Sequence, residues 1–495
     1  MNAPQINDLS FFNEIVLAVS FFFNIFAKNI SQMEIFKDKK IKKIIEKIKK
    51  AIELTKFQGK VYVTGGCIRD SIMGLPIKDV DLVVESPNGA LLVAYLLTAK
   101  ENCYNKKNNP ISYGNSHTVM IRFTNDEELK NIKIELTQTM KKHCSKYDKV
   151  EDCFGTVEED SKLRDLTINA FYYDISNGIL HDYNKGVNDL KTMILRTPHN
   201  PSQLFAQDPI KMLRIIKMSS ELGWGIEKNT WFGIVYNHHL INEVPQEKIG
   251  ELLSQILVSQ NASGGLVKMY YCGLLKEILP DIYDLNSVYE SPNLTMTTFD
   301  HTLKMVDTVQ PFIVNRLAAL FHDIGNVINS KYQRVSTQDA FSADVTMSIL
   351  YDMKFPHDLI CSVGKAIRYH RAFDSCANNK TPSDKKIRKF VNNCGDDLAV
   401  TVDLMSANNL CGDENKPQLV LNILKRIEEL NAVEEANNIK LPIDGNMLMK
   451  ELGIKGGPII GNLLSAIKDA YLENPKITQK ECIKIAKKQL IKLAK

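Results

Sequence analysis

Two aspartates separated by a single residue follow closely after a Gly-Gly pair. In the run VYVTGGCIRDSIMGLPIKDVDLVV, residues 61–84, Gly65-Gly66 precede Asp79 and Asp81. A Gly-Gly turn lets the backbone approach a ligand closely, and amides at the start of a helix attract phosphate. Two carboxylates on one strand face are the oxygen ligands that suit Mg²⁺. An isolated Asp-x-Asp is usually a solvated strand edge, but the combination predicts metal-assisted chemistry on a phosphate.

Short elements must position these groups. Residues 61–63 read as a strand, and Cys67–Met73 as a short helix that ends at Gly74. Strict alternation over residues 79–85 predicts a strand, with Asp79 and Asp81 on the face opposite Val80, Leu82 and Val84. Three more strands are predicted over residues 118–123, 132–137 and 171–174, with a polar loop over 138–160.

The run resembles the head-domain signature of the class II tRNA nucleotidyltransferases and bacterial-type poly(A) polymerases, GGxxRD followed by DxD. Further segments carry the resemblance, which covers roughly residues 40–490. Residues 162–170, KLRDLTINA, are similar to the family's RRDFTINA segment, and residues 182–190 to its DPFGGxxDL turn. Residues 207–214, QDPIKMLR, stand where the family has EDPxRxLR, and residues 245–280 follow its neck helices.

The resemblance implies an α+β chain: a nucleotidyltransferase head with a small mixed sheet, then an all-helical remainder. The implied segments are an N-terminal extension (1–40), a catalytic head (41–200), a helical neck for base selection and RNA binding (201–292), an HD-like helical domain (293–412) and an RNA-binding helical tail (413–495).

It also implies roles for individual residues. Asp79 and Asp81 would hold two Mg²⁺ ions, and Glu135 is either a third metal carboxylate or a solvent-facing strand residue. Gly65, Gly66 and Arg69 would hold the β- and γ-phosphates of a nucleoside triphosphate. Asp165 resembles the residue that accepts the ribose 2′-hydroxyl, and Arg164 is either a phosphate contact or one half of a helix-face ion pair.

Base selection would rest on the QDPIKMLR segment, whose nucleotide-binding positions are Gln207, Asp208, Lys211 and Arg214. A carboxylate at Asp208 accepts the exocyclic amine of cytosine or adenine, and Lys211 donates to the neighbouring ring nitrogen. We expect these two residues on one helix face, three positions apart. The family has Glu and Arg where this chain has Gln207 and Lys211, and lysine lacks the guanidinium fork.

A second set of residues resembles the metal site of HD phosphohydrolases. His301 lies on one predicted helix, the adjacent His322-Asp323 on another, and His370 follows. Nitrogen and oxygen donors of this kind suit a second divalent metal. The family's next histidine and its closing aspartate fall at Gln338 and Asn408, whose neutral amides are poor metal ligands. A working hydrolase and a degenerate helical body both remain open.

Composition sets the remaining bounds. The chain has 495 residues, enough for several hydrophobic cores. Its net charge is only +4, so any RNA must be bound by local basic patches. Such patches are the lysine-rich residues 37–50, 141–142 and 484–495. Ten cysteines lack CxxC or metal-finger spacing, which predicts reduced thiols and a cytoplasmic location. The apolar residues 15–27 are too few to span a membrane. We expect them to form an extension helix on the body, with targeting or membrane association as the alternative.

The sequence thus predicts an enzyme that adds nucleotides from CTP and ATP to RNA 3′ ends without a template, and CCA addition to tRNA is the favoured form. A poly(A) polymerase shares every motif quoted. An HD-type metal phosphohydrolase is the alternative from another class. A non-catalytic RNA-binding module is disfavoured because binding alone has no need of Asp79 and Asp81.

Overall fold

The computed structural model describes residues 35–105, 109–112, 118–142, 148–288, 296–327, 338–374, 382–411, 417–435, 441–454, 457–474 and 476–493. The predicted extension helix over residues 15–27 lies outside these ranges, so its expected position stays a prediction. Two compact units divide the chain: residues 1–244 with 271–274, and residues 245–270 with 275–495. The expected neck, 201–292, is therefore shared between the units, and the five-segment organisation remains a proposal.

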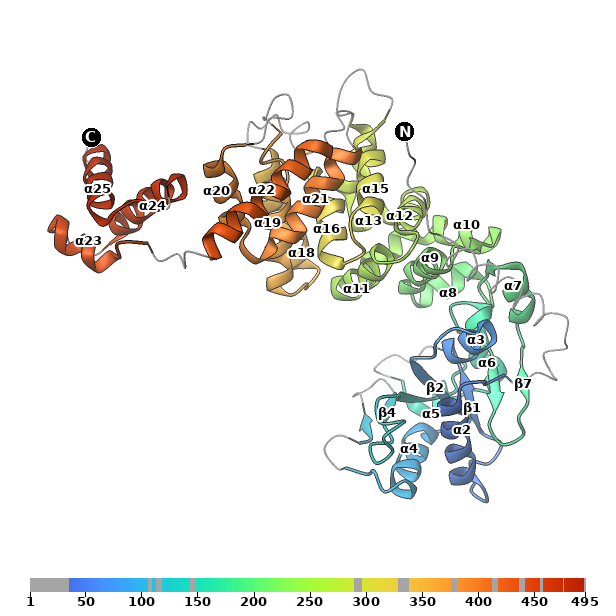
Figure 1. Ribbon diagram of the computed structural model, residues 1–495. Coiled ribbons are helices and arrows are strands. Elements are labelled where there is room, and N and C mark those ends of the chain that lie inside the picture. Colours follow the sequence, from blue (N-terminus) through green and yellow to red (C-terminus); the bar gives the residue numbers. More distant parts are fainter. Residues whose placement is uncertain are drawn as a thin grey trace, which may run out of the picture. The chain divides into compact units, whose positions relative to one another are not determined.

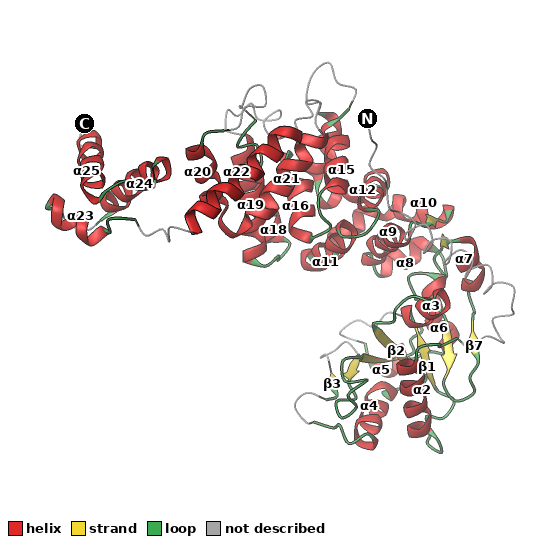
Figure 2. Cartoon of the chain, viewed as in Figure 1, coloured by secondary structure: helices red, strands yellow, loops and turns green. Residues whose placement is uncertain are grey.

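A seven-stranded mixed sheet organises the first unit (Figures 1 and 2). The strand order is β3-β4-β5-β2-β1-β6-β7, and β2 with β5 is the one parallel pair among neighbours that are otherwise antiparallel. The strands are β1 (Val61–Thr64), β2 (Asp79–Val84), β3 (Ile111–Ser112), β4 (Val119–Ile121), β5 (Lys133–Gln138), β6 (Tyr172–Asp174) and β7 (Leu180–His181). The predicted strands are confirmed within a few residues.

One face of this sheet is apolar and covered by helices. Val80, Leu82 and Val84 are fully buried, as the alternation predicted. Helix α4 (Gly89–Lys100) contacts β4, β5 and β2, and α2 (Lys39–Ile52) contacts α4. Asp38 begins α2 by accepting hydrogen bonds from the amides of Lys40 and Ile41, so the head already starts before residue 41.

The opposite face is divided between a small core and the polar residues. Val83 and Tyr62 pack there against Val157 of α6 (Val157–Lys162) and against Tyr172. A capping box at Thr156 starts α6, because its hydroxyl accepts from the Glu159 amide and Glu159 bonds back to Thr156. The expected polar loop over residues 138–160 therefore contains helical structure: α5 (Val150–Cys153) and the first part of α6.

Further helices and one short strand pair complete the first unit. They are α3 (Gly66–Met73), α7 (Gly186–Thr192), α8 (Pro201–Gln207), α9 (Ile210–Leu222) and α10 (Lys228–Asn237), together with the short 3-10 helices η2 (Thr167–Asn169) and η3 (His238–Glu243) and the two-stranded pair β8 (Ile194–Leu195) and β9 (Gly225–Ile226). Helix α10 packs on α8, where the missing side chain of Gly233 makes room for Pro201 and Phe205.

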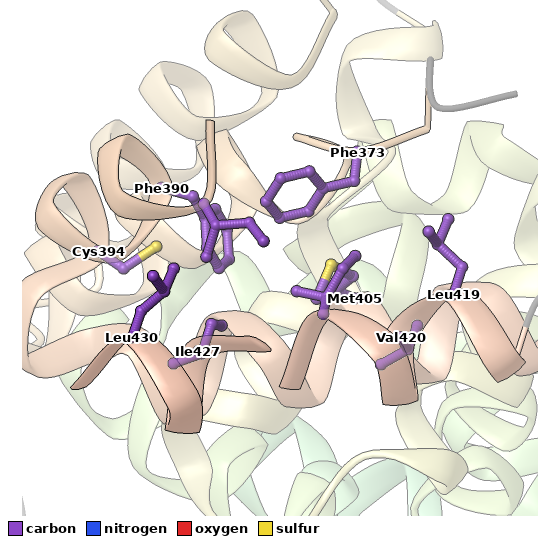
Figure 3. Close-up of a cluster of buried hydrophobic side chains, with 10 residues drawn as sticks. Phe373, Phe390, Cys394, Met405, Leu419, Val420, Ile427 and Leu430 are labelled. Carbon is purple, nitrogen blue, oxygen red and sulfur yellow. The ribbon is translucent and has the colours of Figure 1, made fainter. Parts of the chain in front are cut away.

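All regular secondary structure described in the second unit is helical. Its core includes a cluster in which the rings of Phe373 and Phe390 meet edge to face with a centroid separation of 4.9 Å, and Met405 packs beside them (Figure 3). The helices of residues 246–493 are α11 (Gln246–Leu257), α12 (Ala262–Tyr271), α13 (Leu274–Ile278), α14 (Pro280–Asp284), α15 (Thr298–Thr308), α16 (Ile313–Phe321), α18 (Gln338–Asp352), α19 (His357–Tyr369), α20 (Asp384–Cys394), α21 (Leu398–Cys411), α22 (Pro417–Glu435), α23 (Gly445–Leu452), α24 (Pro458–Glu473) and α25 (Gln479–Leu493).

Two further observations bear on the sequence expectations. Among the described residues, no helix is long and apolar enough to cross a membrane. Seven described cysteines are free thiols, and Cys153 is disulfide-bonded. The expectation that every thiol is reduced was therefore wrong at Cys153, because spacing along the chain does not reveal which cysteines a fold brings together.

Candidate active site

The Gly-Gly turn lies directly beside the second aspartate. Thr64 pairs with Asp81 across β1 and β2, and the chain then turns at Gly65 into α3. Gly65 has a φ of 74°, and a Cβ at this position would lie 2.8 Å from Asp81 Oδ2. Both the left-handed backbone and the close carboxylate therefore require glycine. This arrangement leaves the backbone at the start of α3 open next to a carboxylate.

Three carboxylates lie on two adjacent strands at the polar face, those of Asp79, Asp81 and Glu135. Asp81 pairs with Glu135 in the parallel β2–β5 register, and Asp79 is exposed at the start of β2. Burial, followed by the negative charge of Glu135, raises the pKa of Asp81 to about 6, although Arg164 opposes the shift. Lys133 forms an ion pair with Glu135. Crowded carboxylates with one raised pKa fit a divalent cation, because a cation would relieve their mutual repulsion.

Arg69 is held by a chain of side chains next to the turn. Its guanidinium donates to Asp70 Oδ1 (Nε, 2.8 Å) and to Asn169 Oδ1 (Nη1, 2.6 Å). Asn169 in turn donates from Nδ2 to Asp165 Oδ1 at 3.0 Å. Arg69 is thus linked to Asp165 through one amide, and a phosphate contact would have to be added to these bonds.

A second network fixes Arg164. Its Nε and Nη2 donate to Asp160 Oδ2 at 3.0 and 2.7 Å, and the Tyr172 hydroxyl donates to the same oxygen at 2.6 Å. The other oxygen of Asp160 accepts the Met140 amide at 2.9 Å. Asp160 is buried, so it holds Arg164, β6 and the segment after β5 together at one point. The ion pair expected for Arg164 is present, and it does not turn the residue away from the site.

These groups surround one cavity of about 360 Å³. The cavity wall contains seven of the nine expected nucleotide-binding residues, all except Arg69 and Gln207. Of the three expected metal carboxylates it contains Asp81, whereas Asp79 and Glu135 stand outside it. The lining residues are Gly65, Gly66, Asp81, Thr118, Thr137, Gln138, Met140, Asp160, Leu163, Arg164, Asp165, Asn169, Asp208, Lys211 and Arg214.

Asp208 and Lys211, the residues expected to select the base, both line this cavity, but the backbone between them is not the continuous helix that we expected. Asp208 is not helical: it ends α8 with φ −149° and ψ 85°, and α9 begins at Ile210. The expectation of one continuous helix face was wrong because Pro209 disfavours helical conformation in the residue before it. The two side chains still meet, with Lys211 Nζ 3.6 Å from Asp208 Oδ2.

Lys211 is nearly buried, and its ammonium also donates to the Leu163 carbonyl at 2.8 Å. Burial lowers the pKa of Lys211, and the charges of Asp208 and Asp165 partly offset that effect. The lysine is therefore a positioned donor that joins the α6–η2 segment to the Asp208 side of the cavity.

Sequence reasoning missed several members of the site. Asp160 and Asn169 carry the networks around Arg164 and Arg69, and Met140 and Thr118 line the cavity. A signal existed for Asp160, which stands four residues before Arg164 at ion-pair spacing on a helix. Asn169 lay inside the quoted KLRDLTINA segment, but a spacing pattern does not reveal hydrogen-bond partners.

In the second unit the structure brings together the predicted histidine set. His301, His322 and Asp323 are buried and offer ligand atoms within 4.8 Å of one another. His322 and His370 each place Nδ1 on a backbone carbonyl, that of Ala319 at 2.8 Å and that of Ile367 at 2.7 Å. In His370 this bond directs the proton to Nδ1 and the lone pair to Nε2, as in histidines that bind metals, whereas Nε2 of His322 lies 3.0 Å from Asp323 Oδ2.

Burial favours neutral imidazoles at two members of this histidine cluster, because it lowers the pKa of His301 and of His370. The pKa of His301 is lowered to about 4, first by burial and then by His322, and a hydrogen bond with Asn408 opposes the shift. Burial alone would raise the pKa of Asp323, but His322 and Arg371 hold it below its usual value. Arg371 donates to Asp323 Oδ1 at 2.8 Å. The carboxylate is therefore already neutralised by an arginine.

Comparisons with known proteins agree with this architecture. Residues 61–196 match the poly(A) polymerase head domain, and residues 223–285 match a probable RNA- and SrmB-binding site of polymerase A. A CCA-adding enzyme of Ligilactobacillus salivarius is 26% identical over 91% of this chain and 96% of its own.

Solved structures share the fold. The Bacillus stearothermophilus CCA-adding enzyme, solved with CTP, superimposes with a TM-score of 0.60 at 18% identity, over 92% of this chain and 99% of its own. The Thermotoga maritima CCA-adding enzyme, solved with tRNA, gives 0.57 at 17% identity, over 96% and 98%. At such identities the likeness establishes the fold. The family-model matches add that residues 61–196 are similar to the poly(A) polymerase head domain and that residues 223–285 are similar to a probable RNA-binding segment.

Proposed function

We propose that this protein adds nucleotides from CTP and ATP to tRNA 3′ ends without a template, and that CCA addition or repair is its reaction. The observation that carries the proposal is a single cavity that joins Asp81 and the Gly65-Gly66 turn to Asp165 and to the Asp208–Lys211 pair. A metal-carboxylate edge, a phosphate seat, a ribose acceptor and a base reader are the four parts that nucleotidyl transfer from a triphosphate requires. The curated relative and the solved neighbours are named as CCA-adding enzymes.

Different residues of the cavity would bind the phosphates, the ribose and the base of the nucleoside triphosphate. The amides at Gly65 and Gly66 would donate hydrogen bonds to the terminal phosphates, and Arg164, fixed by Asp160, would present positive charge to them. Asp165, oriented by Asn169, accepts the ribose 2′-hydroxyl and so favours ribonucleotides. Asp208 accepts the amine of cytosine or adenine, and Lys211 donates to the ring nitrogen.

Asp79 and Asp81, with Glu135 as the neighbouring carboxylate, are the residues that would hold Mg²⁺. Bound Mg²⁺ would make the RNA 3′-hydroxyl a better nucleophile and neutralise charge on the transferring phosphoryl group. The exposed Asp79 and the half-buried Asp81 leave the metal edge accessible from solvent, as an incoming RNA end requires.

Poly(A) addition is the alternative within the class, since a site that accepts adenine serves both reactions. The deciding experiment incubates the protein with tRNA that lacks its last three nucleotides and with CTP and ATP, singly and together. CCA addition predicts two cytidines with CTP alone and a stop after one adenosine when both are present. A long adenosine tail with ATP alone would contradict CCA addition and favour poly(A) synthesis.

A second divalent metal at the histidine cluster is a separate proposal, supported by the three ligand atoms within 4.8 Å. We propose no hydrolase there for two reasons. Asn408, a neutral amide, hydrogen-bonds His301 at the position where a carboxylate would be needed. Arg371 donates a hydrogen bond to Asp323 and so neutralises the carboxylate that would hold the metal. A metal-dependent phosphohydrolase is the alternative, and assays of hydrolysis by the wild type and by His322→Ala would test it. The proposed location is the cytoplasm, and fractionation of cells that express the full chain would test it.

A further inference from the structure

Helix α10 carries an exposed stripe of one lysine and two aromatic side chains. Lys228, Phe232 and Tyr236 follow one another at intervals of four residues and therefore lie on one side of the helix. Phe232 is 43% exposed and Tyr236 is 73% exposed. Their ring centroids are 6.4 Å apart with the planes tilted by 32°, and Lys228 Nζ lies 6.0 Å from the Phe232 centroid.

The opposite side of α10 explains why this stripe is held in place. Thr230, Gly233 and Ile234 are buried against the rest of the unit, and Gly233 fits closely against Pro201 of α8. The Asn237 side chain donates to Ser202 Oγ at 3.2 Å. The helix cannot rotate to bury its aromatics without losing these contacts, so two large rings stay in water on a fixed support.

The chemistry of the stripe fits a nucleic acid. Bases stack on exposed aromatic rings regardless of sequence, and a lysine beside the rings attracts phosphate. Within α10, all of which is described, the exposed residues include Lys228 and Asn229 and no carboxylate. The helix also lies inside the segment that matches a probable RNA-binding site.

The stripe is close to the proposed active site. Helix α10 packs on α8, and α8 ends at Asp208 in the cavity wall. Because a helix is roughly 10 Å across, the outer side of α10 stands on the order of 20 Å from the cavity. One RNA molecule could therefore contact both places.

We propose that Lys228, Phe232 and Tyr236 form a stacking platform for unpaired bases of the RNA substrate, and that the platform holds RNA without taking part in nucleotide transfer. This inference rests on the proposed function only for the identity of the RNA. It assigns to three residues a contact that sets affinity for RNA and leaves the triphosphate site unchanged.

The test measures binding and extension separately. Fluorescence anisotropy with labelled tRNA lacking its 3′ nucleotides gives RNA affinity without any need for extension. The double variant Phe232→Ala, Tyr236→Ala should bind this RNA on the order of tenfold more weakly. The KM for RNA should rise with it, while the KM for CTP and kcat at saturating RNA stay at the wild-type values. Lys228→Gln should lower the salt dependence of binding by about one phosphate contact.

A matched control exists in the same unit. Tyr95 and Tyr104 form another exposed aromatic pair, with ring centroids 5.9 Å apart, on and just after α4 rather than on α10. Tyr95→Ala, Tyr104→Ala should leave RNA affinity unchanged, and the conservative pair Phe232→Tyr, Tyr236→Phe should retain it. Circular dichroism checks folding, and the conservative pair and Lys228→Gln keep the test valid if the alanine pair is unstable.

Two results would overturn the platform. Unchanged RNA affinity in the alanine pair would show that the stripe does not bind RNA. A change of oligomeric state in that variant, seen by sedimentation, with RNA affinity intact would show that the stripe contacts a second copy of the chain. Neither result bears on extension by the wild type, so failure of the platform and failure of the proposed function can be told apart.

Discussion

Two clusters of potential metal ligands in this protein differ in how solvent reaches them. In the head, Asp79 is exposed, Asp81 is half-buried, and a cavity of about 360 Å³ opens beside them. In the body, His301, His322 and Asp323 are each at most 1% exposed. The head cluster concentrates negative charge, whereas the body cluster pairs its carboxylate with Arg371. Ligand types alone therefore do not identify a catalytic site, because a substrate phosphate must also reach it.

The strongest test of this contrast removes the head carboxylate. Asp81→Ala should lower nucleotide incorporation on the order of a thousandfold or more, because it removes a carboxylate that we propose holds metal at the transferring phosphate. RNA binding and folding should be retained, since the side chain borders a wet cavity. Glu127, an 85% exposed carboxylate of the same unit, provides the control Glu127→Ala. Near-normal incorporation by Asp81→Ala would exclude the proposed mechanism.

A smaller loss of activity is expected when Asp160, the buried carboxylate that holds Arg164, is changed. Asp160→Asn keeps the shape of the side chain but replaces its charged bonds to Arg164 by weaker ones. The KM for the triphosphate should rise about tenfold, and the free energy of unfolding should fall by about 1–3 kcal/mol because the acceptor is buried. Steady-state kinetics and denaturant unfolding measure the two effects.

Glu158 on the same helix offers the control for this substitution. It pairs with Lys162 at the surface, so Glu158→Gln should change neither quantity measurably. If Asp160→Asn behaves like Glu158→Gln, then Arg164 does not depend on Asp160 for its position, and the network has no role in nucleotide binding.

A still smaller effect is expected on the selection of the base when the residues around Asp208 are changed. Asp208→Ala should increase incorporation of UTP and GTP relative to CTP and ATP. The double change Gln207→Glu, Lys211→Arg restores the family's residues and should sharpen selection by up to roughly tenfold, on the order of 1 kcal/mol. Gln207 stands outside the cavity wall, so Gln207→Glu alone should have no effect. Equal discrimination by the wild type and the double variant would show that this motif does not read the base.

The smallest effect on extension is expected in the body. His322→Ala should leave RNA extension within about twofold of the wild type, although loss of a buried side chain should lower the free energy of unfolding by about 2 kcal/mol. Little metal-dependent phosphatase or cyclic phosphodiesterase activity is expected in either protein. His357, 85% exposed, supplies the control His357→Ala.

Metal binding can be measured directly in the same pair. If the histidine cluster binds a divalent metal, Mn²⁺ should raise the melting temperature of the wild type and of His357→Ala more than that of His322→Ala. Robust hydrolysis that disappears in His322→Ala would show that the buried cluster is catalytic after all. The contrast between an open head and a closed body would then fail.

Much of the head could be predicted from the sequence because local rules govern it. Alternation of Val80, Leu82 and Val84 specifies which strand face is buried, and the Gly65 turn follows from the glycine's backbone freedom. The resemblance then supplied the expected site residues, most of which line one cavity. The continuous helix expected through Asp208 was wrong, although Pro209 carried the signal.

The amino-acid sequence by itself determined the order of elements, the buried face of each strand and the kinds of ligand available at each cluster. Only the tertiary structure decided that Asp160 binds Arg164 together with Tyr172, that Asn169 joins Arg69 to Asp165, and that Arg371 reaches Asp323. These partners come from elements that pack together in space, and side-chain periodicity within one element carries no information on its neighbours. Burial, which separates the head site from the histidine cluster, depends on that same packing.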